Sequence, residues 1–418
     1  MSGVGTLPPP YEDARMALSD IDLDNPDNFI AGTPHHWFKE LRREDPVHWH
    51  KEKEGRGYWC VTKYEDLKFV SRNPLMFSSW RGGTNIQDRD EAALMGMRMI
   101  MLNMDPPQHV KFRRIVQRGF TPQMTAKQEP YLRALSKRIV DQVAHRGECE
   151  FVEELAAELP LQVICELVGV PQEDRKLIFE LSNKLIGFDD PEYRNTEEDA
   201  RAASAQMFGF AMKLAEYYRK NPADNLTTTL MNVEIDGEKL SELEFCSFFL
   251  LLLVAGNETT RTVTTNGMKA LLDHPESLRM LANDLSLVPN AVEEFVRFDP
   301  AVHHFRRTAT QDTEIRGRKI REGDKVVMWY PSANRDEEVF SEPDRFDVTR
   351  QENEHLAFGI GEHYCLGANL ARLELTVIFQ EMLKRLKNPR LAAPVRRLRS
   401  NFINGVKEMR IAFDPERL

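Results

Sequence analysis

Residues 358–372 read FGIGEHYCLGANLAR, and this stretch organises the interpretation of the whole chain. Its first half is a glycine-rich loop. Its second half, from about Leu366, predicts a helix with Leu370 and Val377 on one face. Cys365 stands at the junction of loop and helix. A sulfur at a helix N-terminus faces free backbone N–H groups and the positive end of the helix dipole, and both favour the thiolate over the thiol.

Two interpretations of Cys365 are open at this point. The surrounding glycines let the backbone approach a flat, bulky group while N–H groups point at the sulfur. A thiolate bound axially to a haem iron needs such an arrangement. The alternative is a buried free cysteine that happens to start a helix. The rest of the chain has to decide between them.

The composition is that of an ordinary soluble protein, with 418 residues, 41% hydrophobic and 29% charged. A net charge of −10 argues against a nucleic-acid partner. The five cysteines are widely spaced and lack zinc-ligand spacing, which favours a reducing cytoplasm. The N-terminus has no basic segment followed by an apolar run, so we expect no signal peptide or membrane anchor. The most apolar stretch, residues 245–255, is too short to span a bilayer.

A predicted helix that starts at Ser241 contains residues in its middle that disfavour a regular helix. It begins with a capping signal, because Glu244 follows Ser241 by three residues. Residues 255–261 then read AGNETTR. An internal glycine, a carboxylate beside an apolar run and threonines that bond to the preceding turn all weaken or bend a helix. Such conflicts gather at functional sites, although a helix that emerges into solvent at Glu258 would have the same pattern.

Two other segments allow a functional and a plain interpretation. Residues 105–107, Asp-Pro-Pro, open a helix on which His109 and Arg113 share one face. These two side chains either grip an anion in the interior or belong to a solvated basic surface. The same helix also carries Lys111, Arg114 and Arg118. Residues 95–104 contain five methionines, which predict either a core helix or the mobile wall of an apolar pocket.

The remaining pattern predicts helices interrupted by short strands. Residues 124–255 are largely helical, and strands are expected at 58–62, 305–310, 313–316 and 325–330 with a hairpin-like turn at 322–324. Glu294 and Arg297 lie one helical turn apart and, taken alone, predict a surface ion pair. Residues 331–357 show few periodic signals, and a long stretch of this kind inside a compact domain is usually functional.

Together these stretches resemble the cytochrome P450 family, the haem-thiolate monooxygenases, over nearly the whole chain from about residue 20. Four separated motifs follow the order of that family: AGNET at 255–259, EFVR at 294–297, PDRF at 343–346 and the loop at 358–367. The resemblance implies a mainly α fold with small β-sheets. It also implies a single large domain over residues 21–418, preceded by an irregular leader over residues 1–20 that includes Leu7-Pro8-Pro9-Pro10. It further implies that Arg345 joins Glu294 and Arg297 in a buried charge triad.

The resemblance also assigns a site for haem b, the iron protoporphyrin IX group. Cys365 would be the axial ligand of the iron, and Glu258 with Thr259 would be the catalytic pair, as proton relay and hydrogen-bond donor. His109, Arg113, Arg307 and His363 would bind the two propionates. The other residues expected to hold the cofactor are Ala255, Gly256, Phe358 and Gly367. Substrate would lie against Phe248, Phe249, Leu252, the methionine segment, Ala301, Val302, Phe402 and Ile403.

The partners implied by the resemblance are a lipophilic substrate, O2, and a ferredoxin with its ferredoxin reductase. The ferredoxin would dock on Lys111, Arg114, Arg118 and Arg372, although a solvated basic face explains these residues equally well. The protein would be a cytoplasmic monomer. Motifs such as FSS at 77–79, SANRD at 332–336 and SNF at 400–402 are similar to those of bacterial enzymes that oxidise sterol side chains and methyl-branched lipids. A peroxide-driven peroxygenase and a non-catalytic haem sensor are the alternatives.

Overall fold

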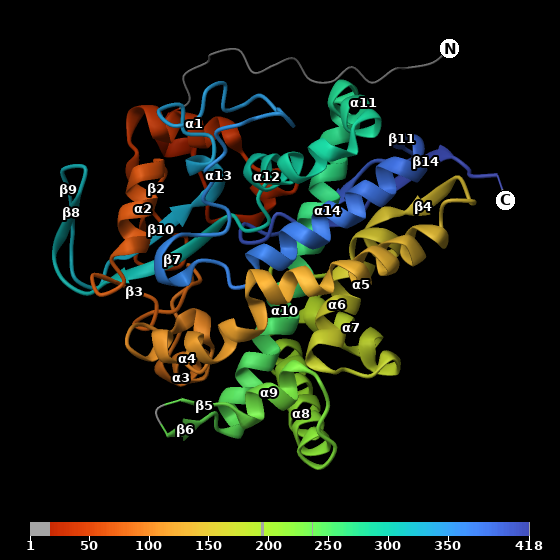
Figure 1. Cartoon of the computed structure of the whole chain (residues 1–418). Helices are drawn as coiled ribbons and strands as arrows, with labels where there is room; N and C mark the ends of the chain where they lie inside the picture. Colours follow the sequence, from red (N-terminus) through yellow and green to blue (C-terminus); the bar gives the residue numbers. More distant parts are fainter. Residues whose placement is uncertain (1–16, 194–195, 236, 418) are drawn as a thin grey trace.

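A single long helix, α10 (Glu242–Asp273), runs through the middle of the computed structural model, and the other elements gather around it (Figure 1). The structure describes residues 17–193, 196–235 and 237–417. The predicted leader therefore lies mostly outside the described residues and stays a prediction. As expected, α10 begins at a capping box in which Ser241 and Glu244 bond each other's backbone N–H groups.

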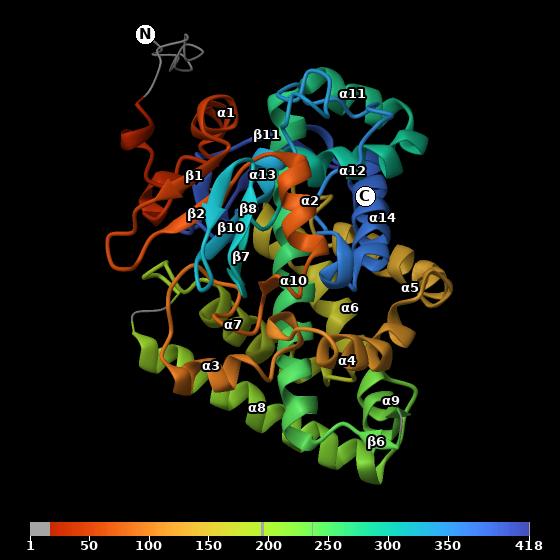
Figure 2. The ribbon, with the colours of Figure 1, turned by 90° about the vertical axis from the view of Figure 1, so that its left-hand side faces the viewer.

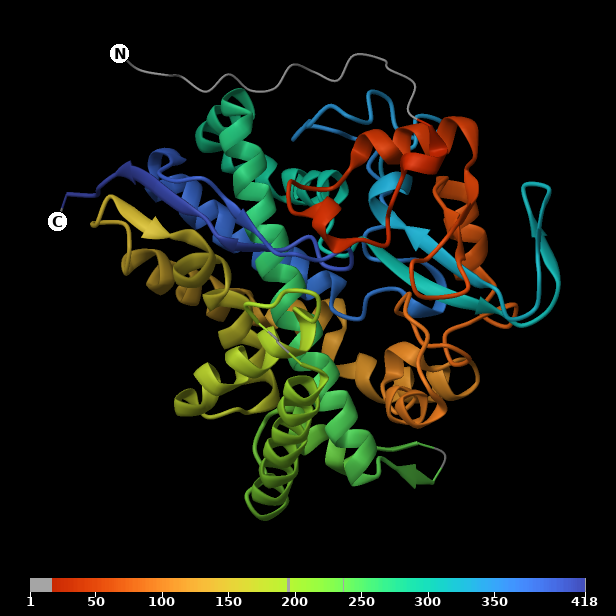
Figure 3. The ribbon, with the colours of Figure 1, turned by 180° about the vertical axis from the view of Figure 1, so that it is seen from behind.

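The helices surround α10 mainly on one side. Helices α6, α7 and α8 pack below and beside it, α5 packs on α14 and α6, and α14 crosses α10 near the centre of the molecule (Figures 1 and 3). The other helices are α1 His35–Glu44, α2 Tyr64–Arg72, α3 Glu91–Met97, α4 Gln108–Val116, α5 Pro122–Asp141, α6 Glu158–Val168, α7 Arg175–Ile186, α8 Glu197–Lys220, α9 Leu226–Asn232, α11 Pro275–Asn283, α12 Val288–Phe298, α13 Tyr330–Ala333 and α14 Ala368–Arg385.

A five-stranded sheet with the order β1-β2-β10-β7-β3 forms the other side of the molecule (Figure 2). Its neighbours pair antiparallel except for β2 and β10, which run parallel. The strands of the chain are β1 Val47–His50, β2 Tyr58–Val61, β3 Phe77–Ser78, β4 Glu148–Glu150, β5 Glu234–Ile235, β6 Glu238–Lys239, β7 His304–Ala309, β8 Thr313–Ile315, β9 Arg318–Ile320, β10 Lys325–Trp329, β11 Lys387–Leu391, β12 Arg396–Arg397, β13 Val406–Glu408 and β14 Arg410–Asp414.

The mainly helical fold with small sheets confirms the fold class, but the predicted position of a hairpin turn is wrong. The hairpin turn lies between β8 and β9, at Arg316 and Gly317, instead of at residues 322–324. Both turn residues have positive φ, 47° and 77°, as a two-residue hairpin turn requires. A turn is present at Glu322 and Gly323, where the N–H of Asp324 donates to the carbonyl oxygen of Arg321 at 3.0 Å. Because β9 pairs with β8 and not with β10, this turn leads the chain into β10 without forming a hairpin.

Glu294 and Arg297 of α12 form a buried brace instead of a surface pair. Both side chains are fully buried, and Arg297 donates to both carboxylate oxygens of Glu294 at 2.7 Å. The prediction that Arg345 is the third member of this brace is wrong, because its side chain is 61% exposed and pairs with Glu342. Arg350 takes that place and donates from Nε to Glu294 at 3.2 Å. Arg345 contributes only its carbonyl oxygen, which accepts from Arg297 and from Arg350.

Helix α10 is long and apolar enough to cross a membrane, judged by length and composition. Of its most apolar window, 61% is buried inside the protein. The core helix of a soluble protein passes the same test, so this observation is weak support for a membrane span.

Candidate active site

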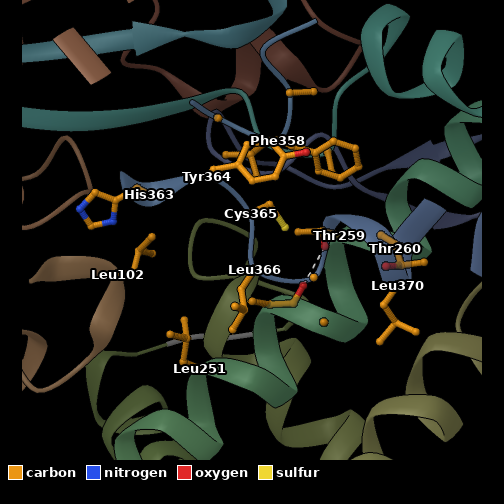
Figure 4. A pocket seen from close by; sticks show the side chains of 18 of the residues that line it. Leu102, Leu251, Thr259, Thr260, Phe358, His363, Tyr364, Cys365, Leu366 and Leu370 are labelled. Carbon is orange, nitrogen blue, oxygen red and sulfur yellow. Dashed lines mark hydrogen bonds between the residues drawn. The ribbon is translucent and has the colours of Figure 1, made fainter. Parts of the chain in front are cut away.

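A pocket lies where α10, α4 and the loop before α14 converge, and it gathers most of the predicted site. We call residues 358–367 the cysteine loop. Figure 4 shows Cys365, Thr259 and His363 around one open space, contributed by the cysteine loop and by α10. Of the eleven residues predicted to catalyse or to hold the cofactor, those lining the pocket are His109, Arg113, Ala255, Gly256, Thr259, Arg307, Phe358, His363, Cys365 and Gly367.

The cysteine loop is held in shape by its own backbone. The N–H of Cys365 donates to the carbonyl oxygen of Phe358 at 2.8 Å, which closes the loop just before α14. Gly359 and Gly361 have φ values of +70° and +75°, a conformation that side chains rarely adopt. A Cβ on Gly361 would also approach the carbonyl oxygen of Ser71 to 2.9 Å, so this glycine lets the loop pass close to α2.

The electrostatics of Cys365 differ from the sequence expectation. Burial raises the pKa of the Cys365 thiol, although the N–H of Gly367 and the charges of Arg113 and Arg372 act in the opposite direction. The helix N-terminus is therefore not sufficient to ionise the sulfur. A thiol of this kind becomes a thiolate when a metal cation binds it, because the cation replaces the lost solvation.

Four basic side chains meet on one side of the pocket. The rings of His109 and His363 lie 4.1 Å apart, and Arg113 and Arg307 line the same space. Burial lowers the pKa of His363 to about 2, with further contributions from Arg307, His109 and Arg113. Burial and the charges of Arg113 and Arg307 likewise lower the pKa of His109 to about 4. The two imidazoles are therefore neutral, and the two guanidinium groups supply the positive charge.

This basic cluster fits a planar group that carries carboxylates. The Nδ1 atom of His109 is buried and has no hydrogen-bond partner among the described residues. Glu362 lies 3.9 Å away from it, beyond hydrogen-bond distance. Buried donors normally find an acceptor, so an anionic ligand is the expected partner of this cluster. Cys365, which lines the same pocket, could supply a sulfur ligand for a metal ion at the centre of such a group.

Helix α10 forms the wall that faces the cysteine loop. The Thr259 hydroxyl donates to the carbonyl oxygen of Ala255 at 2.7 Å, the back-bonding expected from the sequence (Figure 4). Gly256 keeps the helix close to α6, because a Cβ there would lie 3.3 Å from Ile164. The polar break in α10 therefore lies inside the protein and not at a solvent-exposed end.

Glu258 is the predicted site residue that does not line the pocket. Its side chain is fully buried on another face of α10 and forms an ion pair with Arg261. Arg261 also donates to Asn183 of α7 at 2.9 Å. A buried carboxylate needs a partner, and the guanidinium one turn along α10 supplies it. The sequence could place Glu258 beside the pocket but could not decide toward which face it points.

The rest of the pocket is apolar, with some changes from the predicted lining. Phe248, Leu252, Ala301 and Val302 line it as expected, and Met101 is the member of the methionine segment that does so. Three expected residues pack elsewhere. Phe249 contacts Phe210 and Phe245, Phe402 contacts Phe305 and His304, and Ile403 pairs with Val302 in an isolated β-bridge. Met95 is 60% exposed, so the methionine segment is not a continuous wall.

Several lining residues were not predicted from the sequence. They include Ile164, Leu251, Thr260, Val263, Val296, Tyr330 and Glu374. Glu374 did leave a signal, because it lies four residues after Leu370 on the apolar face of α14. Arg372 is bound to Glu293 by two hydrogen bonds of 2.7 and 2.9 Å, and its side chain stays partly exposed, so its predicted part in docking stays a prediction.

Comparison with known proteins identifies the family to which a cysteine and a basic cluster around one pocket belong. Residues 32–389 match the family Cytochrome P450. The chain is 41% identical to a steroid C26-monooxygenase of Rhodococcus jostii (strain RHA1) over 403 residues, which cover 94% of this chain and 84% of that protein. It is 40% identical to a methyl-branched lipid omega-hydroxylase of Mycobacterium tuberculosis (strain ATCC 25618 / H37Rv), with 98% and 97% covered.

A solved structure extends the comparison to the fold. The Mycobacterium marinum cytochrome P450 CYP268A2 in complex with pseudoionone superimposes with a TM-score of 0.87 at 37% identity, covering 94% of this chain and 98% of that chain. The protein is thus a haem-thiolate monooxygenase by class. The chain belongs to the cytochrome P450 family, and its cofactor is haem b.

Proposed function

We propose that this enzyme inserts one oxygen atom from O2 into a C–H bond of a lipophilic substrate and receives its electrons from a ferredoxin. The observation that carries the proposal is the composition of the pocket. Cys365 and the Thr259 segment of α10 line one space, the charged side chains gather at one side of it, and much of the remaining wall is apolar.

Each end of the cofactor has its own residues in this proposal. Cys365 would hold the iron through its sulfur, and Ala255, Gly256, Phe358 and Gly367 would lie against the ring. Arg113 and Arg307 neutralise the propionates, and the neutral imidazoles of His109 and His363 donate hydrogen bonds to them. When bound, the haem iron activates O2, and the electron density supplied by a thiolate ligand favours O–O cleavage.

The protein's own part in the chemistry is to supply protons and exclude water. Thr259 holds its hydroxyl proton at the pocket wall, at present directed to the Ala255 carbonyl. Glu258 acts as the relay behind it. Because Arg261 holds the Glu258 carboxylate away from the pocket, the relay requires that this ion pair opens. The same guanidinium group donates a hydrogen bond to Asn183 of α7. Movement of α7 is therefore coupled to the release of Glu258.

The substrate is a sterol, a branched fatty acid or a terpenoid. The substrate side of the pocket is formed by Leu102, Phe248, Leu251, Val296 and Val302, which provide aliphatic and aromatic surface and no charged group. An extended, mostly apolar molecule fits such a wall better than a polar one. The sterol and methyl-branched lipid activities of the two relatives support the same class.

The electrons come from outside the chain in this proposal. Arg114 lies exposed on α4, the helix that also supplies His109 and Arg113 to the pocket. An acidic ferredoxin that docks on α4 would therefore reach the cofactor through a short path. Arg118 belongs to the predicted docking surface, but its side chain lies outside what the structure describes. We also propose a monomer that works in the cytoplasm.

A spectral screen tests the substrate proposal. Sterols, branched fatty acids and terpenes are added to the haem-loaded enzyme, and displacement of water from the iron is followed by the shift of the haem absorbance. Compounds that shift the spectrum are then incubated with O2, a ferredoxin and its reductase, and the products are identified. We expect hydroxylated product from at least one of the three classes. Spectral shifts without any oxygenated product would overturn the proposal.

A further inference from the structure

A second pocket of the protein is lined mainly by arginines, and we call it the arginine pocket. It lies between the turn that joins β1 to β2, the segment 81–98, strand β7 and the turn before β10. Its charged lining residues are Arg56, Arg81, Asp88, Arg89, Arg98 and Arg306. Among the described residues, five guanidinium groups thus share the pocket with one lining carboxylate, in a chain whose net charge is −10. Such a local concentration of positive charge in an acidic protein attracts anions.

Strand β7 separates the arginine pocket from the haem pocket. Successive side chains of a strand point to opposite faces of the sheet. Phe305 and Arg307 line the haem pocket, whereas Arg306 and Thr308 line the arginine pocket. The two pockets therefore lie on opposite faces of one strand, and the arginine pocket is not an extension of the site around Cys365.

Arg306 is the most buried of the charged residues that line the arginine pocket. Its side chain is 2% exposed, and it donates hydrogen bonds of 3.0 Å to the Ile86 carbonyl oxygen and to Asp88. Its Nε atom is buried and has no hydrogen-bond partner among the described residues. Gly82 makes room for the guanidinium group, because a Cβ at that position would clash with one of its terminal nitrogens. The fold thus keeps a buried arginine whose hydrogen-bonding capacity is not fully used.

The carboxylates at this end of the arginine pocket do not balance the cations around them. Asp88 lies 3.0 Å from Arg306, 3.2 Å from Lys325 and 3.6 Å from Arg56. Lys325 also pairs with Glu52. Two carboxylates therefore serve three cations. Burial acts to raise the pKa of Asp88, but the charges of Arg306, Lys325 and Arg56 together lower this pKa below its ordinary value, as expected where positive charge is in surplus.

Two further arginines of the pocket have exposed carboxylates as their acidic partners. Arg81 pairs with Glu322 at 2.7 Å, and the two side chains are 45% and 59% exposed. Arg98 lies over the ring of Trp80 at 5.2 Å and pairs with Glu91, which is 69% exposed. Exposed ion pairs contribute little to stability, so an anion of higher charge can displace these carboxylates from the two guanidinium groups.

We propose that the arginine pocket binds a phosphate group. At neutral pH a phosphate group carries about two negative charges and has several acceptor oxygens, which match the fork of N–H donors that a guanidinium group presents. The group belongs either to free inorganic phosphate or to a phosphate ester. Because Arg56 and Arg81 are largely exposed, the pocket is open to solvent and leaves room for the organic part of an ester.

Isothermal titration calorimetry with inorganic phosphate tests the proposal. The haem-loaded enzyme is used so that Arg113 and Arg307 are not open to phosphate, and sodium chloride keeps the ionic strength constant. We expect one saturable site per chain in wild type. The double variant Arg81→Gln/Arg98→Gln should bind phosphate at least about tenfold more weakly, because charge-assisted hydrogen bonds are lost. The absence of saturable binding to wild type, or equal affinity in the double variant, would overturn the proposal.

Arg219→Gln is the matched control. Arg219 is an exposed arginine of α8 that pairs with Glu242 at 2.9 Å, much as Arg81 pairs with Glu322. Its variant should bind phosphate as wild type does. Equal weakening in this variant would show a general effect of net charge and would contradict a defined site. Arg306→Met tests the buried arginine separately, and if that variant does not fold, the exposed positions decide the question.

Glycerol 3-phosphate distinguishes the two sources of the phosphate group. Since the pocket is open, we expect this ester to bind within a few-fold of the affinity of inorganic phosphate and to lose affinity in the same double variant. Binding of inorganic phosphate alone would identify the free ion as the ligand. These titrations measure binding and not turnover, so their outcome is independent of the proposed oxygenase function, and either proposal can fail while the other stands.

Discussion

At the scale of single residues, the site depends on a few side chains whose neighbours set their chemistry. Thr259 and Thr264 are both back-bonded one turn along α10, yet only Thr259 lines the pocket. Glu258 and Glu374 are both fully or nearly buried carboxylates, yet one is paired with Arg261 and the other has no cation beside it. The same residue type therefore takes different roles according to what its side chain faces.

Thr259→Ala should separate electron consumption from product formation. The variant removes a hydroxyl proton from the pocket wall. Because alanine fits a helix as well as a threonine that bonds to the preceding turn, we expect full haem content. Product yield per electron should fall about tenfold or more, with the missing electrons appearing as hydrogen peroxide. Thr264→Ala is the matched control and should remain coupled. Unchanged coupling in Thr259→Ala would remove this residue from the proton route.

His304 should make the protein sensitive to acid. Burial against Trp329 lowers the pKa of this imidazole from 6.5 to about 3. Below pH 6.5 the unfolded chain binds a proton that the folded protein excludes, so stability falls with falling pH until about pH 3. Each pH unit in that window costs about 1.4 kcal/mol.

His304→Phe removes that proton uptake. Denaturant unfolding between pH 6.5 and 5 should therefore show a pH slope that is smaller than in wild type by about one proton. The exposed His145 can be changed to Phe as the control, and its variant should keep the wild-type slope. Equal slopes in wild type and His304→Phe would contradict the assignment.

At the scale of elements, the brace between α12 and the segment 334–353 holds the chain that leads to the cysteine loop. Glu294 accepts from Arg297, Arg350, Asn353 and the backbone N–H of Asp347. One carboxylate thus fixes several points of a segment that has little regular secondary structure. This explains why residues 331–357 can lack periodic signals and still deliver Cys365 to a defined place.

Arg350→Ala should destabilise the protein by about 2 kcal/mol, because a hydrogen bond to a buried charged group is lost. Arg345→Ala should change stability by less than about 0.5 kcal/mol, since that side chain is exposed. Denaturant midpoints of the two variants measure the difference. If Arg345→Ala were the more damaging change, the triad implied by the family resemblance would be right and the arrangement in the structure wrong.

At the scale of the whole molecule, local motifs could be predicted from the sequence better than the contacts between distant segments. The capping box of α10 and the glycine-rich shape of the cysteine loop are local patterns, and the structure confirms them. Which arginine reaches Glu294, and which face Glu258 takes, depend on packing between distant segments. Periodicity carries no information about such contacts, so Arg350 could not be preferred over Arg345 from the sequence alone.

The proposed docking of a ferredoxin on α4 predicts a dependence on salt. Exposed charges are screened as ionic strength rises, so the rate of reduction should fall between low and high salt. Arg114→Glu should slow reduction at low salt by about tenfold. Arg219→Glu changes an exposed arginine on the distant helix α8 and is the control. This variant should be reduced at the wild-type rate. A rate independent of salt would favour a basic face without a docking role.

The absorbance of the reduced carbon monoxide complex tests the central claim most directly, because it reports the ligand opposite carbon monoxide. We predict the thiolate-type spectrum for wild type and for Cys149→Ser, a buried cysteine away from the pocket. Cys365→Ser and Cys365→His should both lose that spectrum while haem remains bound through the propionate cluster. An unchanged thiolate-type spectrum in the Cys365 variants would contradict the account, because another group would then hold the iron.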